Sequence, residues 1–316
     1  MKKIIIILLL FCFILPLAFG ELKVGFYESS CQKAESIVKN VVKSRFNRDK
    51  TITAALLRLH FHDCAVSGCD ASILINSTQS NTAEKESGAN FDVRGFDIID
   101  EVKETLESAC PSTVSCADII TLATRDAVAL SGGPQYEVPT GRRDGLVSNI
   151  NNVKIPGPSS SVSVISQFFN KSLGLTTQEM VTLFGAHTVG VARCSFFDDR
   201  LSSPDPTMDP GLNAKLVKLC SSRDDNDPST PLDQKTSLLV DNGFYTQILA
   251  KKGVLQIDQQ LALDQSTRGF VTDIASNGVK FQKNFANAMV KMGSIDVLVG
   301  NQGEIRQKCS VVNNHS

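Results

Sequence analysis

The sequence lacks several patterns that would place it in other protein classes. It has no tryptophan, no CxxC pair, no internal repeat and no low-complexity tract, and strand-like alternation of apolar and polar residues is scarce. Without a CxxC pair, and with His60 and His62 as the only close histidines, a structural zinc site is disfavoured. The missing repeats and heptads argue against a solenoid or a coiled coil.

An excess of charge of one sign is also lacking. The chain has 32 basic and 33 acidic residues, and removing an N-terminal segment with Lys2 and Lys3 leaves 30 against 33, a formal charge of −3. No nucleic-acid or anionic-membrane partner is implied by this balance. With 316 residues, of which 42% are hydrophobic, the chain can bury a full core in one large domain or two lobes.

A long apolar run stands at the N-terminus. Lys2 and Lys3 precede the run from Ile4 to Phe19, and Gly20 follows it. This pattern is typical of a secretory signal peptide, so we expect residues 1–20 to be cleaved off. A transmembrane anchor is disfavoured, because the run falls short of the ~20 residues that a span needs and has no second basic flank.

The cysteine count fits an oxidising, secretory route. Of nine cysteines, Cys12 leaves with the signal peptide, and an even number remains. Eight cysteines in a secreted chain predict disulfides, although they allow 105 pairings. The short separation of Cys64 and Cys69 suggests a local loop. Glycosylation sequons stand at Asn76, Asn170 and Asn314.

Most of the chain is predicted to be helical. Apolar residues recur at helical spacing in three sets: Ile37, Val41, Val42 and Phe46; Ile98, Ile99, Val102 and Leu106; Phe281, Phe285, Met289 and Met292. Segments 131–160 and 221–237 are rich in Gly, Pro, Asn and Ser and predict loops. The loops divide the chain into two helical lobes.

The segment 58–64, RLHFHDC, joins a guanidinium and an imidazole on one helical face. Arg58 and His62 are four residues apart, so their side chains can converge on one small molecule. A fixed cation beside an acid/base suits cleavage of a polar bond. A metal-dependent hydrolase using His60, His62 and Asp63 is the alternative, but the two histidines face opposite sides of a helix, and we interpret His60 as structural.

A second helix has a well-marked beginning. Thr176 and Glu179 form the pattern of a capping box, and Leu175 with Met180 forms a hydrophobic staple. Apolar spacing then continues through Met180, Leu183, Phe184 and His187, which puts His187 on the buried stripe. Such a histidine is usually a core residue, but Gly185 and Ala186 favour a ligand, because small residues let something flat approach the helix.

These motifs and several others resemble those of class III (secretory plant) haem peroxidases, and the chain is similar to horseradish peroxidase along nearly all of its mature length. The motifs are RLHFHDC (58–64), GCDAS (68–72), RGF (94–96), SCAD (115–118), GRRD (141–144), GAHTVG (185–190) and DN (241–242). The resemblance implies a mostly α-helical, two-lobed fold. Haem would lie between a distal lobe, residues 21–161 completed by 273–316, and a proximal lobe, residues 162–272.

On the proximal side, the resemblance implies that His187 is the axial ligand of the haem iron. Asp258, in the segment LQIDQQ, would accept the hydrogen of the other ring nitrogen. A carboxylate partner makes an imidazole a stronger donor, which favours a low redox potential and helps to break the O–O bond of a peroxide.

On the distal side, His62 is implied to be the acid/base and Asn90 the acceptor that holds its other ring nitrogen. Hydrogen peroxide must lose a proton to bind iron, and its far oxygen must gain one to leave as water, so one neutral imidazole can serve both steps. Arg58 would stabilise the developing negative charge, and Phe61 completes the distal wall.

Two calcium sites are expected. Asp63 lies at the end of a helix, where a carboxylate is unfavourable unless neutralised, and Asp70 and Ser72 supply more oxygen nearby. The family's distal site matches Asp63, Val66, Gly68, Asp70 and Ser72, with Glu84 linking it to the distal pocket. The proximal site matches Thr188, Asp233, Thr236, Leu239 and Asp241.

The resemblance also implies the pairing of the cysteines and one ion pair. The disulfides would be Cys31 with Cys110, Cys64 with Cys69, Cys116 with Cys309, and Cys194 with Cys220. Asp118 and Arg142 match a buried, structural ion pair.

Several residues that are expected to lie near the reducing donor depart from the family pattern. Tyr136 replaces a usual tryptophan, and with three tyrosines in all no surface radical relay stands out, so donors are expected at the haem edge. Pro156 and Phe196 match residues of the access channel. Gly88 and Ser159 stand where horseradish peroxidase has phenylalanines, so an aromatic donor would be held less firmly. Leu232 replaces an aromatic residue beside the proximal histidine, and Ser237 replaces the proline that usually follows the calcium-site threonine.

The resemblance implies a secreted, extracellular enzyme of the apoplast or cell wall. It would contain one haem b and two Ca²⁺, act as a monomer without a membrane span, reduce hydrogen peroxide to water and oxidise phenolic donors by one-electron steps. Peroxide catabolism, the response to oxidative stress and lignin or suberin metabolism fit this activity. A secreted wall-binding protein that retains the haem fold is the alternative. It is disfavoured because every redox position is intact.

Overall fold

The computed structural model describes residues 21–202, 205–221 and 227–313, so the predicted signal peptide and the predicted sequon residue Asn314 lie outside the described residues. This part of the chain is mostly α-helical, as predicted, and the helices are α1 (Ala34–Arg48), α2 (Ile52–Cys64), α3 (Phe96–Ala109), α4 (Cys116–Leu130), α5 (Val162–Lys171), α6 (Thr177–Phe184), α7 (Pro210–Cys220), α8 (Gly243–Leu249), α9 (Gln256–Leu263), α10 (Arg268–Ser276) and α11 (Gly278–Met292). No helix of these residues is long and apolar enough to cross a membrane.

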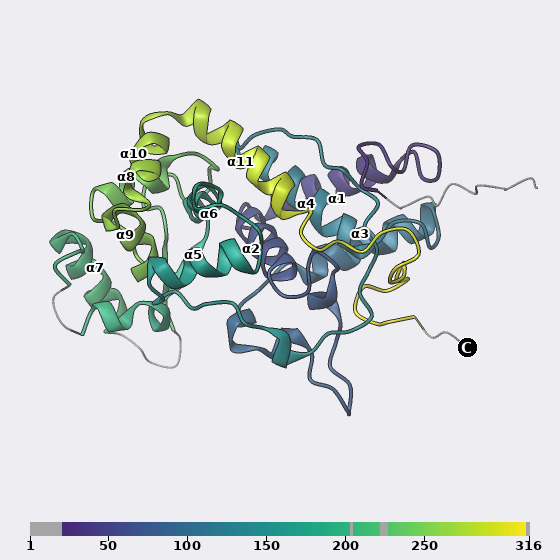
Figure 1. Ribbon diagram of the computed structural model, residues 1–316, viewed down its shortest axis with the longest axis horizontal. Coiled ribbons are helices and arrows are strands. Elements are labelled where there is room, and N and C mark those ends of the chain that lie inside the picture. Colours follow the sequence, from purple (N-terminus) through teal and green to yellow (C-terminus); the bar gives the residue numbers. More distant parts are fainter. Residues whose placement is uncertain (1–20, 203–204, 222–226, 314–316) are drawn as a thin grey trace, which may run out of the picture.

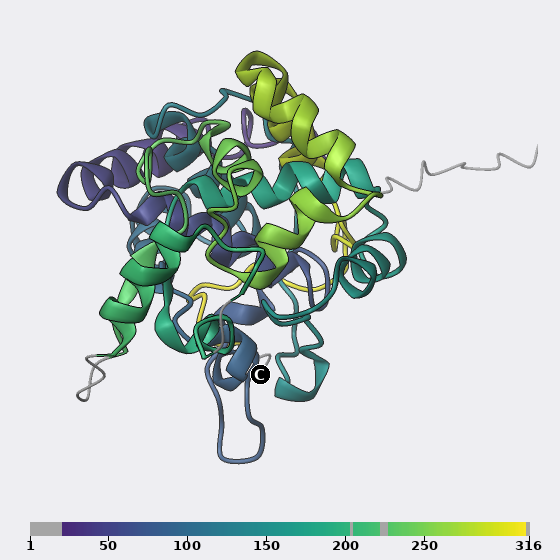
Figure 2. The ribbon, with the colours of Figure 1, turned by 90° about the vertical axis from the view of Figure 1, so that its left-hand side faces the viewer.

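Strands contribute little to this part of the chain. β1 (Val191–Arg193) pairs antiparallel with β2 (Ser229–Pro231), and Ala192 lies opposite Thr230. The predicted loop 131–160 contains the short 3-10 helix η4 (Ile150–Asn152) and isolated β-bridges at Thr140, Arg143 and Asp144. The loop between η1 (Ser72–Leu74) and η2 (Glu84–Glu86) extends away from the body in both views, and the sequon residue Asn76 is exposed there (Figures 1 and 2).

One apolar core is built from α1, α3 and α4, which pack against one another at one end of the molecule (Figure 1). The predicted stripe of α3 is buried, since Ile98, Ile99, Val102 and Leu106 all belong to this core. On α1 the stripe is buried at Val42 and Phe46 and partly buried at Ile37 and Val41. Helical spacing therefore located the core face of α3 in full and that of α1 in part, since the fully buried Val38 was not in the predicted set.

A second apolar core gathers α5 to α11. Its members on α11 are Phe281, Phe285, Ala288, Met289 and Met292, and α11 packs along α6. α10 and α11 are the yellow-green helices, and α7 to α9 lie at the end of the molecule away from α1 and α3 (Figure 1). The exact lobe boundaries at 161 and 273 stay a prediction.

α2 belongs to both cores. Leu56 and Leu59 pack into the first core, whereas Leu57 and Cys64 pack into the second. Nearly every face of this helix is therefore buried, which explains its run of apolar residues. A helix held between two cores is a rigid support for the polar side chains that it carries.

Candidate active site

A cavity of about 710 Å³ is lined by residues of α2 and of the 3-10 helix η5 (Gly185–Thr188) that follows α6. Arg58 and His62 line it from α2, and His187 lines it from η5. Most of the remaining lining is apolar, with Leu57, Phe61, Ile165, Phe168, Phe169, Leu183, Phe184, Val189, Met289 and Met292 among its members. Such a cavity fits a large, mostly apolar group that an imidazole nitrogen can bind.

Arg58 and His62 lie side by side, as their spacing predicted. The Arg58 Nε atom is 3.4 Å from His62 Nε2. The same guanidinium donates to the carbonyl oxygens of Ala89 at 3.3 Å and Phe91 at 2.9 Å, which fixes it against the neighbouring loop. The cation is therefore oriented before any substrate arrives.

The tautomer of His62 follows from its hydrogen-bond partner. Asn90 Nδ2 donates to the carbonyl oxygen of Glu84 at 2.6 Å, so the Asn90 Oδ1 atom must face the imidazole. His62 Nδ1 lies 2.7 Å from that oxygen and therefore carries the hydrogen. The lone pair of His62 is thus on Nε2, the atom beside Arg58.

His62 is held in its neutral form. Burial, and after it the charge of Arg58, lowers the pKa of His62 to about 4, against the opposing effect of the Asn90 hydrogen bond. Near pH 6 the imidazole is therefore ready to accept a proton.

Phe61 lines the cavity and stacks on Phe169. The two ring centroids are 5.7 Å apart, with an angle of 14° between the ring planes. Phe169 lies on α5 and is buried. The ring of Phe61 is therefore fixed by a helix of the second core.

His60 lies away from the cavity and is buried. Its Nε2 atom is 3.4 Å from Thr121 Oγ1 on α4, and burial lowers its pKa to about 3. His60, Cys64 and Cys69 are close enough to hold a metal ion, but the two sulfurs form a disulfide with each other. These observations support a structural role and leave no thiolate for zinc.

His187 is oriented by a buried carboxylate. Its Nδ1 atom is 2.8 Å from Asp258 Oδ1 on α9, so Nδ1 carries the hydrogen and Nε2 keeps a lone pair. Asp258 is 1% exposed, and its Oδ2 atom has no partner within the described residues. The rings of Phe184 and Phe244 meet the imidazole edge-on and hold its plane.

The helix before His187 begins as predicted but ends earlier. Thr176 Oγ1 accepts from Glu179 N at 3.2 Å, and Glu179 Oε2 accepts from Thr176 N at 2.7 Å, which completes the capping box. The prediction that the α-helix carries His187 is wrong, because α6 ends at Phe184 and the chain tightens into η5. His187 reaches the cavity from this 3-10 turn.

The prediction for Gly185 is also corrected. A Cβ at Gly185 would lie 2.5 Å from Phe281 Cε2 and 2.6 Å from the Tyr245 hydroxyl, and Gly185 is not part of the cavity lining. Its small size is required by packing against α8 and α11. Ala186, which does line the cavity, is the small residue that permits a close approach.

Five residues predicted as a calcium site lie in the last turn of α2 and in the segment that follows it: Asp63, Val66, Gly68, Asp70 and Ser72. Asp63 Oδ2 accepts from Ala71 N at 3.1 Å, but Asp63 Oδ1 is buried without a partner in the described chain. Burial and the neighbouring carboxylate of Asp70 raise the pKa of Asp63 well above its usual range. A buried carboxylate oxygen without a donor suits a bound cation.

Glu84 connects this loop to His62. Ser72 Oγ is 3.4 Å from Glu84 Oε2, and the Glu84 carbonyl oxygen accepts from Asn90, the partner of His62. Burial and the charge of Asp70 raise the pKa of Glu84 to about 7. The loop and the imidazole therefore share one hydrogen-bonded chain.

A second group of oxygens surrounds the end of η5. The predicted proximal residues are Thr188, Asp233, Thr236, Leu239 and Asp241. Thr188 Oγ1 has three acceptors within reach: Asp233 Oδ2 at 3.3 Å, Leu239 O at 3.4 Å and Asp241 Oδ1 at 3.1 Å. One hydroxyl hydrogen cannot serve three acceptors, so lone pairs outnumber hydrogens here. Converging oxygens of this kind are what Ca²⁺ requires.

The disulfides join the cysteines that the resemblance paired: Cys31–Cys110, Cys64–Cys69, Cys116–Cys309 and Cys194–Cys220. Arg142 Nη1 and Asp118 Oδ1 form an ion pair at 2.7 Å, fully buried as expected. Ser115 is the N-cap of α4, since its hydroxyl accepts from Asp118 N.

Arg306 is a functional candidate that sequence reasoning missed. It is buried and donates through Nη2 to the carbonyl oxygens of Asp70 at 3.1 Å and Ala71 at 2.8 Å, so it holds the loop after α2. No local pattern could mark it, because these partners are 236 and 235 residues away in sequence.

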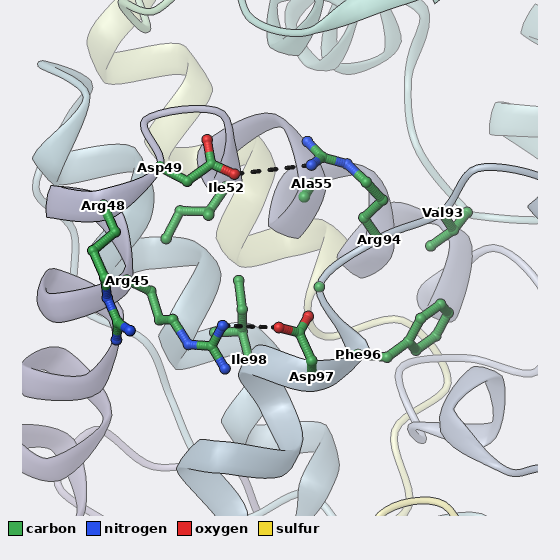
Figure 3. Close-up of a pocket in the computed structure, with 11 residues that line it drawn as sticks. Arg45, Arg48, Asp49, Ile52, Ala55, Val93, Arg94, Phe96, Asp97 and Ile98 are labelled. Carbon is green, nitrogen blue, oxygen red and sulfur yellow. Dashed lines mark hydrogen bonds and ion pairs between the residues drawn. The ribbon is translucent and has the colours of Figure 1, made fainter. Parts of the chain in front are cut away.

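A second cavity, of about 480 Å³, lies near the end of α1 and the beginnings of α2 and α3 (Figure 3). Four of its five charged side chains form two ion pairs, Arg45 with Asp97 at 2.9 Å and Arg94 with Asp49 at 3.9 Å, and the fifth, Arg48, donates to Ser44. Its lining among the described residues includes no histidine and no thiol. The paired histidines that line the first cavity have no counterpart in this lining.

Comparison with known proteins gives consistent matches. Residues 38–277 match the family model described as Peroxidase. The chain is 56% identical to Peroxidase 44 of Arabidopsis thaliana over 315 residues, which cover 99% of this chain and 100% of that relative. Peroxidase 57 of the same plant is 55% identical over 309 residues, covering 96% of each chain. Peroxidase 5 of Vitis vinifera is 45% identical over 304 residues, covering 93% and 92%. With these matches along nearly the whole chain, and with two histidines in one apolar cavity, the protein belongs to the class III plant peroxidases.

Proposed function

We propose that this peroxidase reduces hydrogen peroxide with His62 and Arg58 on one side of a single haem b and His187 with Asp258 on the other, and that phenols are its donors. The observation that supports this most strongly is the pair of histidines lining one cavity. One of them is held by an amide oxygen and the other by a buried carboxylate.

The cavity's residues fit haem. Its lining is mostly apolar, and His187 Nε2 takes part in no hydrogen bond with the described residues. His187 would hold the iron, and Asp258 would strengthen it as a donor by accepting the Nδ1 hydrogen. Bound haem supplies an iron centre that exchanges two electrons with peroxide and one with each donor.

His62 moves the protons of the peroxide reaction. Its neutral Nε2 accepts the proton of the nearer peroxide oxygen and returns it to the farther oxygen, which leaves as water. Arg58, already fixed by two carbonyl oxygens, stabilises the negative charge that develops on the departing oxygen. Asn90 keeps the hydrogen of His62 on Nδ1 and thereby keeps Nε2 available.

The complete reaction balances with two donors. One hydrogen peroxide and two phenols give two waters and two phenoxyl radicals, because each phenol gives up one electron and one proton. Pro156 and Phe196 line the cavity and would flank the donor's approach.

Two calcium ions complete the proposal. Asp63, Val66, Gly68, Asp70 and Ser72 would hold the distal ion, and Thr188, Asp233, Thr236, Leu239 and Asp241 the proximal ion. The unpaired buried Asp63 Oδ1 atom and the surplus of acceptors around Thr188 support these sites. Glu84 would transmit the order of the distal loop to His62.

We place the enzyme outside the cell, in the apoplast or cell wall, as a monomer. The N-terminal signal peptide pattern, the four disulfides and the exposed sequon residues Asn76 and Asn170 support this route. Peroxide catabolism and cell-wall phenolic metabolism, including lignin and suberin, are the processes that suit such a donor class.

The assignment is tested on the purified holoenzyme. We expect a haem absorption band and oxidation of guaiacol with hydrogen peroxide. His62→Leu should keep the haem band but lower the rate constant for peroxide by about 10²- to 10⁴-fold, the usual contribution of an acid/base. His187→Ala should instead release haem, because it removes the axial ligand.

His60→Leu is the matched control for the distal change. It removes an imidazole from the other face of α2, away from the cavity, and should keep the peroxide rate constant. A colourless protein, or a His62→Leu variant that reacts with peroxide at the normal rate, would contradict the proposed roles.

A further inference from the structure

Two glycines line the cavity at exposed positions. Gly88 begins the 3-10 helix η3 (Gly88–Asn90), and Gly157 lies in the loop before α5. A Cβ built on either glycine would have no heavy atom within 4 Å. The space outside both residues is therefore open, and it belongs to the mouth of the cavity.

Neither glycine is required by the backbone. A glycine usually marks a positive φ or a close approach of another group, and Gly185 shows the second case, since its Cβ would lie 2.5 Å from Phe281. Gly88 and Gly157 have neither feature, because both lie outside the left-handed region and face open space. Because neither glycine has a side chain, the opening of the cavity is unobstructed at these two positions.

The opening is held in place by the residues around it. Arg58 donates to the carbonyl oxygen of Ala89, next to Gly88. On the other loop, Ile257 N donates to the carbonyl oxygen of Pro158 at 3.0 Å, which ties the loop to the helix that carries Asp258. Both loops are thus attached to the segments that position the two histidines.

The cavity next to this opening offers aromatic surface. Phe168 and Phe196 line it and are half-buried, so their rings remain accessible to a ligand. Flat aromatic groups pack well on such rings. A donor longer than one ring could place its hydroxyl inside the cavity while its remaining part rests at the mouth.

We propose, on the basis of the proposed peroxidase function, that Gly88 and Gly157 set the size limit for donors and admit phenols extended by a second aromatic ring. Each such donor loses one electron and one proton from its hydroxyl, and peroxide is the oxidant, with two phenols oxidised per peroxide. Side chains at these two positions would exclude the extension without blocking a single-ring phenol.

The test compares two methoxyphenols of different length. Guaiacol has one ring, whereas syringaldazine has two methoxyphenol rings joined by an azine bridge. The unaltered holoenzyme should oxidise both. The Gly88→Phe and Gly157→Phe variants, and most strongly their combination, should lower kcat/KM for syringaldazine by about tenfold or more while guaiacol changes less than about twofold.

Three controls separate steric filling from other effects. Gly269→Phe on α10 also adds a ring in open space, but outside the cavity lining, and should change neither donor. Gly88→Ala and Gly157→Ala restrict the backbone without filling the mouth and should keep the original ratio. If a phenylalanine variant loses its haem band, the leucine variant at that position takes its place.

Several results would overturn the inference. If the phenylalanine variants lost kcat/KM equally for both donors, the substitutions would have moved the loops instead of narrowing the opening. If their kcat/KM for syringaldazine were unchanged, the opening would not select donors by size. Unaltered enzyme that oxidises guaiacol but not syringaldazine contradicts the inference alone. Protein that holds haem but oxidises neither donor contradicts the proposed function as well.

Discussion

At the scale of single residues, the proposed peroxide reaction depends on one imidazole remaining neutral. His62 is 8% exposed and lies beside Arg58, and both facts disfavour its cation. In the proposed reaction the neighbouring guanidinium would therefore have two effects, since it would stabilise negative charge on the departing oxygen and it keeps the imidazole of His62 unprotonated. The two effects can be separated by measuring the rate constant for peroxide against pH, because only the effect on the pKa of His62 moves the pH at which the rate constant declines.

The pH profile of the peroxide reaction should show this arrangement. Because the pKa of His62 is lowered to about 4, the rate constant should stay level down to about pH 5 and decline as pH falls through the pKa. Arg58→Leu removes a cation, so the pKa should rise and the decline should move to higher pH. The rate constant itself should fall by about 10²- to 10³-fold.

Stopped-flow measurement of the haem band after mixing with peroxide gives this profile. Arg48→Leu is the control, because Arg48 is exposed on α1 and outside the lining of the histidine cavity. A decline centred near pH 6.5 in the unaltered enzyme, the ordinary range of histidine, would contradict the proposed environment of His62.

Residue-level prediction from the sequence succeeded where the relation is local. The convergence of Arg58 and His62 follows from a spacing of four on a helix, and the structure places them 3.4 Å apart. The role of Gly185 could not be predicted, because its neighbours Tyr245 and Phe281 are contributed by distant helices. Asn90 was identified through family resemblance, since no periodic pattern links it to His62, 28 residues away.

At the scale of elements, the beginning of α6 is fixed by its own residues and its end is not. The capping box uses residues three apart, so it can be read from sequence. The change from α-helix to the 3-10 helix η5 occurs where the backbone meets α8, whose Tyr245 hydroxyl lies within hydrogen-bonding distance of two carbonyl oxygens of α6, at 2.8 Å from Val181 O and 3.0 Å from Thr182 O. A contact with a distant helix can end an α-helix before its apolar spacing ends, and it cannot be predicted from that spacing.

The capping box should contribute measurably to stability. Thr176→Ala removes the hydroxyl that accepts from Glu179 N, and the free energy of unfolding should fall by about 1 kcal/mol, the usual cost of losing such a cap. Denaturant unfolding of the holoenzyme, followed by circular dichroism, gives this value.

Thr272→Ala is the matched control for the cap. This threonine is exposed within α10 and donates to the carbonyl oxygen of Arg268 one turn earlier, so its removal should change stability little. Equal effects of the two substitutions would show that the box adds nothing beyond an ordinary surface hydroxyl.

At the scale of the whole molecule, α2 links the two apolar cores, and covalent bonds link distant segments to the same region. The Cys116–Cys309 disulfide joins residues 193 apart, and Arg306, close to Cys309, holds the loop after α2. Helical spacing predicted the faces of the helices. It could not predict which core each face joins, because packing between helices depends on segments far apart in sequence.

Calcium removal should test how the loops support this assembly. Asp63 and Asp70 are buried close together with raised pKa values, so without a cation their repulsion opposes the folded loop. Asp233 and Asp241 likewise share the hydroxyl of Thr188. If each ion is present at about 100 times its dissociation constant, each contributes about 2.7 kcal/mol to folding.

Chelation with EGTA should therefore lower the Tm of the holoenzyme by roughly 5 °C or more, and elemental analysis should find two calcium ions per chain before treatment.

Asp63→Asn should lower the calcium content to one and slow the peroxide reaction, because Glu84 and Asn90 connect that loop to His62. Asp241→Asn should also leave one calcium ion per chain, but the ion lost would be the one beside Thr188, which follows His187 in sequence. This substitution should therefore weaken haem retention more than it lowers the rate constant for peroxide. Added Ca²⁺ should restore the Tm of chelated enzyme better than Mg²⁺, because several protein oxygens at flexible distances suit the larger ion. An unchanged Tm together with no bound calcium would contradict both sites, and the surplus of acceptors around Asp63 and Thr188 would then need protons in place of a cation.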